Sequence, residues 1–307
     1  MFKPDPARPK GAPHAFLPAL AAGAAGTLGG TMVVGTRYVV GEIDPIILSL
    51  LRFGLAAACL IPAALFFTRG RIPWRDASAI GLLGCLYFSI YPVLFALSLQ
   101  YTTAARGALI LATTPLATLS IGLALRRETI TRHKLIGAML TLSGVAVAVG
   151  ESAFGGAKEH LLGDALMAIG MLMGAAYNVF GKTYFQRHSQ LQVTALAMAA
   201  GWIVLMLYAL GAGYFSAGLP HISANGWWAV LYLGTIAGAL PIYIYSWALG
   251  HATPTQVGVG IGMNPVVAIS LGALLLSEPL NWHLGVGLAC VLSGIVLANW
   301  PGRKPAQ

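Results

Sequence analysis

The sequence predicts an all-α membrane protein with ten transmembrane helices, arranged as two five-helix repeats of opposite orientation. Three observations support this: the composition, ten long apolar runs and a self-similarity at a spacing of 150 residues. Of the 307 residues, 57% are hydrophobic and only 9% are charged, whereas a soluble domain carries about 25% charged residues. The mean hydropathy is +0.77. In water such a chain would expose large apolar patches, so lipid is its expected solvent.

Each apolar run is long enough to form one membrane-spanning helix. A bilayer core of about 30 Å needs about 20 apolar residues per helix. Gly and Ala are spread through the runs, and small residues let neighbouring helices approach closely in lipid. Charged, Gly-rich or Pro-containing segments separate the runs. The ten predicted spans are 15–37, 45–68, 75–98, 103–125, 131–150, 162–184, 192–214, 226–249, 255–276 and 283–300.

The charges predict the orientation. If the N-terminus is cytoplasmic, 14 of the 18 Lys and Arg residues lie in cytoplasmic segments and six of the nine Asp and Glu residues lie outside. Cytoplasmic loops of membrane proteins are enriched in Lys and Arg, so the net charge of +9 indicates topology and not nucleic-acid binding. Both termini are therefore expected in the cytoplasm. The first run is too long for a signal-peptide core and is expected to remain as a helix.

The three cysteines, Cys59, Cys85 and Cys290, lie inside apolar runs. They form no CxxC motif and no Cys/His cluster, so we expect neither a disulfide framework nor a metal site from them.

An internal repeat relates the two halves of the chain. A shift of 150 residues aligns residues 115–148 with 265–298 without a gap and gives 11 identities in 34 positions. The matched residues include Pro115 with Pro265 and Glu128 with Glu278. Since each half has five helices, the second half must enter the membrane from the opposite side. Inverted repeats are typical of secondary transporters. The alternative is duplication of a purely structural helix bundle.

Two sets of segments carry a family resemblance. Residues 104–116 (AARGALILATTPL), 125–130 (LRRETI) and 142–145 (LSGV) resemble the EamA domain of the drug/metabolite transporter superfamily, and 248–265, 277–280 (SEPL) and 293–295 resemble its second copy. The resemblance covers nearly the whole chain. It implies a ten-helix exporter of small metabolites in the bacterial inner membrane, with a central cavity lined by helices 1, 3, 4, 6, 8 and 9. Some relatives export aromatic or other amino acids.

The expected organisation follows from the spans and the resemblance. It comprises a cytoplasmic tail (1–14), a first EamA-like repeat (15–150), an outer linker (151–161), a second EamA-like repeat (162–300) and a second cytoplasmic tail (301–307).

Two prolines inside predicted spans mark candidate substrate-site segments. Pro115 and Pro265 each remove a helix hydrogen bond and kink the backbone, and interrupted helices often frame transporter sites. The alternative is a packing kink satisfied by neighbouring helices. The residues beside the kinks that we expect to bind substrate are Thr113, Thr114, Gly258, Gly262 and Asn264.

Aromatic side chains supply the second group of candidates. Tyr87, Tyr91 and Phe95 are four residues apart and share one helix face. Such a stripe is also typical of core packing or an interfacial belt, but Tyr87 and Tyr91 lie too deep for a belt and their hydroxyls need partners. The further candidates are Tyr177, Asn178, Tyr243, Tyr245 and Trp247.

Three arginines lie near the outer ends of predicted spans. Arg37, Arg52 and Arg106 are expected to reach the headgroups or to pair with Glu42 or Asp44. A second interpretation makes Arg106 the attractor of a substrate carboxylate at the outer mouth of the transporter.

The cargo prediction rests on which polar groups the spans contain. No Asp or Glu lies near a mid-span, which favours facilitated diffusion over proton coupling, because coupling usually needs an intramembrane titratable group. The site residues suit neutral or zwitterionic small molecules, amino acids among them. The chain carries no phosphate-binding loop and no hydrolase or metalloprotease motif, so we expect neither cofactor nor enzyme activity. The alternatives are a proton-coupled antiporter, an intramembrane enzyme and a structural bundle; the oligomeric state stays open.

Overall fold

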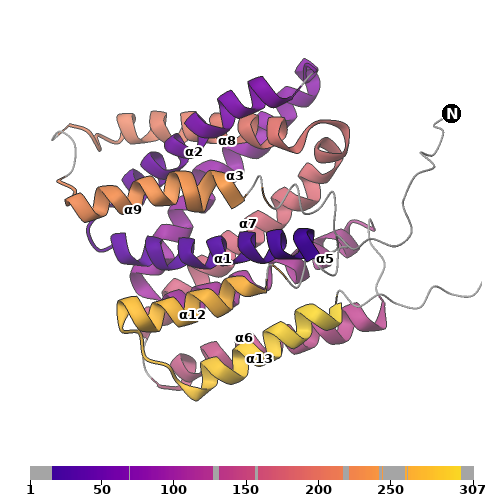
Figure 1. Ribbon diagram of the computed structural model, residues 1–307, viewed down its shortest axis with the longest axis vertical. Coiled ribbons are helices and arrows are strands. Elements are labelled where there is room, and N and C mark those ends of the chain that lie inside the picture. The colour runs from indigo at the N-terminus through magenta and orange to yellow at the C-terminus, as the bar shows by residue number, and fades with distance from the viewer. Residues whose placement is uncertain are drawn as a thin grey trace, which may run out of the picture.

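The computed structural model describes residues 16–68, 70–126, 131–155, 158–216, 221–241, 244, 260 and 262–298. All regular secondary structure in these ranges is helical. Figure 1 shows the helices running roughly parallel to one another, as expected for a bundle that crosses a membrane. Over the described residues, the all-helical prediction is confirmed.

The first half follows the predicted spans closely. The span predicted at 103–125 is interrupted, as the proline implied, and forms α4 and α5. Asp44 begins the second helix as its N-cap, since its carboxylate accepts the amide hydrogens of Ile46 and Ile47. The helices are α1 (Phe16–Val39), α2 (Pro45–Phe67), α3 (Trp74–Tyr101), α4 (Ala104–Leu111), α5 (Thr114–Ala124) and α6 (Arg132–Gly155).

The second half repeats this order. The helix predicted from residue 162 begins four residues earlier, so Asp164 lies inside it and not at its end. A π-helical turn, η1, continues α9 and is not predicted by the sequence pattern. The elements are α7 (Lys158–Arg187), α8 (Gln190–Gly211), α9 (Ala224–Gly234), η1 (Thr235–Ala239), α12 (Met263–Leu276) and α13 (Trp282–Ala298).

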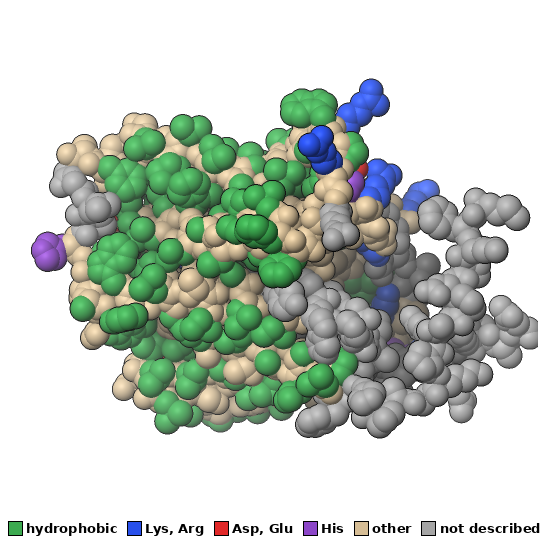
Figure 2. All heavy atoms as spheres, turned by 45° about the horizontal axis from the view of Figure 1, so that its top comes forward, with side chains coloured by type: hydrophobic (Ala, Val, Ile, Leu, Met, Phe, Trp, Pro, Cys, Tyr) green, Lys and Arg blue, Asp and Glu red, His purple; other side chains and the backbone are tan. Residues whose placement is uncertain are grey.

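Length and composition make several of these helices fit to cross a bilayer. Within the described ranges, five helical segments meet both criteria: Pro45–Phe67, Trp74–Tyr101, Ala104–Ala124, His160–Arg187 and Gln190–Gly211. Leu, Ile and Phe side chains such as Leu65, Phe66 and Leu274 project outward from the bundle. The face drawn in Figure 2 is largely covered by hydrophobic side chains, as contact with lipid requires.

The inverted repeat is visible in the packing of α6 on α13, which lie side by side at one edge of the bundle (Figure 1). A Cβ on Gly137 would lie 2.6 Å from the Gly294 carbonyl oxygen, and one on Gly144 would lie 2.7 Å from the Gly287 carbonyl oxygen. Gly287 and Gly294 are the counterparts of Gly137 and Gly144, 150 residues later. Gly137 thus contacts the counterpart of Gly144, and Gly144 contacts the counterpart of Gly137. A two-fold axis produces this reciprocal pattern.

The two ends of the bundle differ in charge. We call one the acidic end, where Glu42, Asp44, Asp164 and Glu278 lie, and the other the basic end. At the basic end Asp76 is paired with His188 and Arg187. Lys and Arg side chains gather toward the right of Figure 2. The described basic residues of this end are Arg71, Arg75, Arg126, Arg132, Lys134, Lys182 and Arg187.

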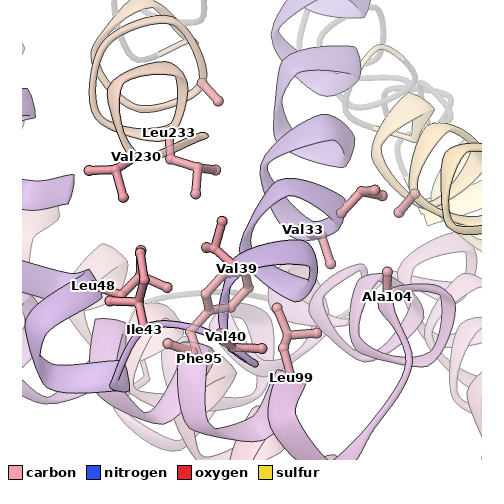
Figure 3. Packing of buried hydrophobic residues seen from close by; sticks show 14 of the residues in the cluster. Val33, Val39, Val40, Ile43, Leu48, Phe95, Leu99, Ala104, Val230 and Leu233 are labelled. Atoms are coloured by element: carbon pink, nitrogen blue, oxygen red, sulfur yellow. The ribbon is translucent and has the colours of Figure 1, made fainter. Parts of the chain in front are cut away.

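A large apolar core packs the helices together at the acidic end. It joins α1, α2, α3, α4, α7, α9, η1 and α12. Figure 3 shows Val39, Val40, Phe95 and Leu99 converging in this core. Two hydrogen bonds brace it, one from Arg37 Nη1 to the Leu99 carbonyl (2.7 Å) and one from Gln100 Nε2 to the Val40 carbonyl (2.9 Å).

Candidate functional site

Aromatic rings from α3 and α7 form a continuous column inside the bundle, which we call the tyrosine column: Tyr177, Tyr87, Tyr91 and Phe95. The ring centroids of Tyr177 and Tyr87 are 4.6 Å apart and those of Tyr87 and Tyr91 are 4.8 Å apart, and both pairs are stacked. Tyr91 and Phe95 follow at 5.9 Å. The structure therefore brings together four of the residues that the sequence predicts for the site.

Helical periodicity and two glycines position this column. Tyr87, Tyr91 and Phe95 share one face of α3 because they are four residues apart. The face packs on α7, where a Cβ at Gly170 would lie 3.2 Å from the ring of Tyr91 and one at Gly174 3.5 Å from the ring of Tyr87. Glycine at these positions gives the rings room to lie flat between the two helices.

The column also carries polar groups. The hydroxyl of Tyr177 is buried and has no hydrogen-bond partner among the described residues. A buried hydroxyl without a partner costs free energy. Such a group is expected where a ligand or water completes the hydrogen bonding.

Arg52 of α2 extends the column, although it is not one of the site residues that the sequence predicts. Its guanidinium carbon lies 5.5 Å from the ring centroid of Phe95 and 5.0 Å from that of Phe53. The residue is only 6% exposed, so it does not reach for the headgroups as expected. Its position in the sequence could have indicated burial, because Arg52 lies seven residues after Pro45, about 10 Å into the helix.

Arg106 is placed differently from its predicted role as an outer attractor. It is buried in α4 and forms a salt bridge through Nη2 with Asp164 Oδ2 of α7. Its Nε donates to Asp164 Oδ1 (3.3 Å), which also accepts the hydroxyl of Thr102 (2.7 Å). Nη1 of Arg106 donates to the Ala148 carbonyl (3.3 Å). In this structure Arg106 therefore ties α4 to α6 and α7.

Thr113 and Thr114 stabilise the kink at Pro115. Pro115 has no amide hydrogen, and the Thr114 hydroxyl donates to the Leu111 carbonyl instead (2.5 Å). The Thr113 hydroxyl donates to the Ile110 carbonyl (2.7 Å). The protons of both hydroxyls are therefore used within the same segment of chain, and substrate binding by these threonines stays a prediction.

The second break lies at the equivalent place. Gly262 caps α12, and Pro265 is buried near its start. Asn264 presses against α1: a Cβ on Gly29 would lie 2.5 Å from its Nδ2. Its Oδ1 is buried without a partner among the described residues. Asn264 is thus a second place in the described bundle where a polar atom awaits a partner.

One described candidate of this group, Asn178, does not join the column. Asn178 follows Tyr177 in α7, and its side chain is exposed, since successive helical residues point about 100° apart. Tyr243, Tyr245, Trp247 and Gly258 lie outside the described residues.

Comparison with known proteins gives the family. The chain matches the EamA-like transporter family over residues 16–150 and 161–300. It is 26% identical over 274 residues to an "Uncharacterized transporter" of Archaeoglobus fulgidus, covering 88% of this chain and 94% of that protein. It is 25% identical to a "Probable amino-acid metabolite efflux pump" of Salmonella typhimurium, covering 87% and 91%. An "Uncharacterized inner membrane transporter YedA" of Escherichia coli is 27% identical over 280 residues, covering 87% of each chain.

A solved crystal structure has the same fold. It superposes with a TM-score of 0.66 at 22% identity and covers 92% of this chain and 96% of that one. The two matched segments correspond to the two halves that the α6 and α13 glycines relate to each other. The chain belongs to the EamA-like transporter family of the drug/metabolite transporter superfamily, and it is a membrane transporter.

Proposed function

We propose that this transporter is a secondary exporter of small neutral or zwitterionic metabolites, with amino acids, including aromatic ones, as its cargo. The observation that carries the proposal is the tyrosine column. Stacked rings lie inside a membrane bundle, beside a buried hydroxyl that has no partner among the described residues. Flat apolar surfaces beside polar groups fit molecules with one apolar and one polar part.

Two further facts support this cargo. A relative of similar length is named as a probable amino-acid metabolite efflux pump. In addition, each of the five acidic side chains that the structure describes already has a polar partner at an end of the bundle. None of them lies in the column to neutralise a cationic drug, and none offers a mid-membrane proton site. Facilitated diffusion down the substrate gradient is therefore favoured over proton exchange.

The proposed mechanism is alternating access. Two halves of the same fold but opposite orientation can exchange conformations, and the exchange opens a site between them to each side in turn. In the described structure the apolar core packs the helices together at the acidic end. We place this end outside the cell and the basic end in the cytoplasm, since Lys and Arg favour cytoplasmic segments. Both termini are then in the cytoplasm, and the protein lies in an inner membrane.

Flux through liposomes tests the proposal. Purified protein in liposomes loaded with labelled phenylalanine should release the label faster than protein-free liposomes, with saturation and with competition by other amino acids. Tyr87→Ala and Tyr91→Ala should each lower this flux about tenfold or more, since each removes a ring from the column. Tyr208→Ala is the matched control, because Tyr208 is exposed on α8 and its loss should leave flux unchanged.

The other outcomes distinguish the alternatives. Flux that does not saturate would point to a channel. Flux that requires a pH gradient would establish proton coupling. If no metabolite of a broad panel moves, or if both column variants transport at the wild-type rate, the proposed function is wrong.

A further inference from the structure

A buried cation in α2 lies beside the tyrosine column, and no carboxylate among the described side chains pairs with it. Arg52 is 6% exposed, and charged side chains inside a membrane are costly, so they usually pair or mark a functional site. All five described carboxylates contact other groups. Glu42 accepts from Ser223, Asp44 caps α2, Asp76 pairs with His188, Asp164 with Arg106, and Glu278 with Arg37 and α4.

The described contacts of the Arg52 guanidinium are with two aromatic rings and a thioether sulfur. Its guanidinium lies near the rings of Phe53 and Phe95, and Nη2 donates to the sulfur of Met32. Cation–π contacts offset part of the cost of burying a cation. They leave most of the five N–H donors of the guanidinium group without a strong acceptor, and the acceptor that matches the planar group best is a carboxylate.

The column connects this cation to a second polar atom. Phe95 contacts Arg52, Tyr91 follows Phe95, and Tyr87 lies between Tyr91 and Tyr177. The Tyr177 hydroxyl at the far end is buried, with no hydrogen-bond partner among the described residues. Within the described part of the chain, a cation without a carboxylate partner and a hydroxyl without a hydrogen-bond partner therefore lie at the two ends of the column.

We propose that Arg52 is the carboxylate-binding residue of the transport site, and that the cargo is a monocarboxylate whose flat apolar part stacks on the tyrosine column. This inference rests on the proposed function. The single guanidinium selects one carboxylate, because a dianion such as a phosphate monoester would bring a second charge that no described basic group in the column neutralises. An amine without a carboxylate would meet an uncompensated positive charge.

The experiment compares three probes that differ at the carboxylate: L-phenylalanine, L-phenylalaninamide and 3-phenylpropionate. Binding is measured on purified protein by isothermal titration calorimetry, and flux is measured separately in liposomes. Wild-type protein should bind the two carboxylates at least about tenfold more tightly than it binds the amide. This is the amount expected of one charge-assisted interaction. Arg52→Gln should lose this preference and should bind the amide at least as tightly as the wild type does.

Two further variants separate recognition from folding. Arg75→Gln removes an exposed arginine at the basic end and should leave the preference unchanged. Arg52→Lys keeps the charge but not the planar group, so it should lower the affinity for both carboxylates and leave the amide unaffected. It tests the inference even if Arg52→Gln does not fold.

The outcomes are distinct. Loss of carboxylate preference in the Arg52 variants alone supports the inference. Equal binding of acid and amide by the wild type, or an undiminished preference in Arg52→Gln and Arg52→Lys, overturns it, since a purely structural arginine would not set the preference. If the preference depends on Arg52 but no probe crosses the liposome membrane, the recognition site stands and the proposed transport function fails.

Discussion

At the scale of single residues, the three arginines that look alike in the sequence have three different environments. Arg37 donates to a backbone carbonyl and lies 3.7 Å from Glu278. Arg106 pairs with Asp164, and Arg52 has no carboxylate partner among the described residues. The sequence could not separate them, because their partners are on other helices and many residues away. The depth of each arginine in its span was readable, but which helix faces it was not.

The ion pair of Arg106 and Asp164 makes a stability prediction. Asp164→Leu alone should lower the free energy of unfolding by about 3–5 kcal/mol, because it leaves the Arg106 charge buried without its carboxylate. Thermal unfolding of the purified protein in detergent would measure this.

The double variant Arg106→Met with Asp164→Leu supplies the control. It removes both charges together, so most of the lost stability should return. If Asp164→Leu is as stable as the wild type, the pair does not hold α4 against α7.

At the scale of elements, the sequence predicted where helices bend but not how the bends are satisfied. Pro115 locates the break between α4 and α5, and the hydroxyl of Thr114 fills the place of the missing amide. The same residue is predicted to bind substrate, because the sequence does not distinguish a polar side chain that binds substrate from one that satisfies the kinked backbone. Which role it takes depends on a rotamer, and no spacing rule determines that.

The crossing of α6 and α13 makes a second stability prediction. Gly287→Leu should destabilise the protein by about 1–3 kcal/mol or more, since its side chain would overlap the Gly144 carbonyl, 2.7 Å from a Cβ at that position. Gly285→Leu is the matched control on the same helix, because a Cβ there meets nothing within 4 Å. Equal unfolding temperatures for the two variants would contradict the close crossing.

At the scale of the whole molecule, the fold was predictable because lipid imposes simple rules. Apolar length sets the spans, and an odd number of helices per repeat sets their inversion. The apolar core at the acidic end was not predictable, since it depends on contacts between side chains of seven α-helices and η1. The tyrosine column lies between these cases: the α3 stripe was readable, whereas Arg52 became a neighbour of it only through the packing of α2.

The orientation can be tested with single cysteines. In a background with Cys59, Cys85 and Cys290 replaced by Ala, Arg71→Cys and His221→Cys each place one thiol at an exposed position, at opposite ends of the bundle. An impermeant maleimide added to intact cells should label position 221 and spare position 71 until the cells are lysed. Labelling of position 71 alone would reverse the orientation, and equal labelling of both would contradict the span count.

Glu278 of the second repeat contacts two helices of the first repeat. Its carboxylate accepts the amides of Ala104 (2.9 Å) and Ala105 (3.4 Å) at the start of α4 and lies beside Arg37 of α1. One side chain thus holds two helices of the opposite repeat, so separating the repeats at this end breaks all of these contacts together. Opening on that face should therefore occur as one cooperative step and not as a gradual leak.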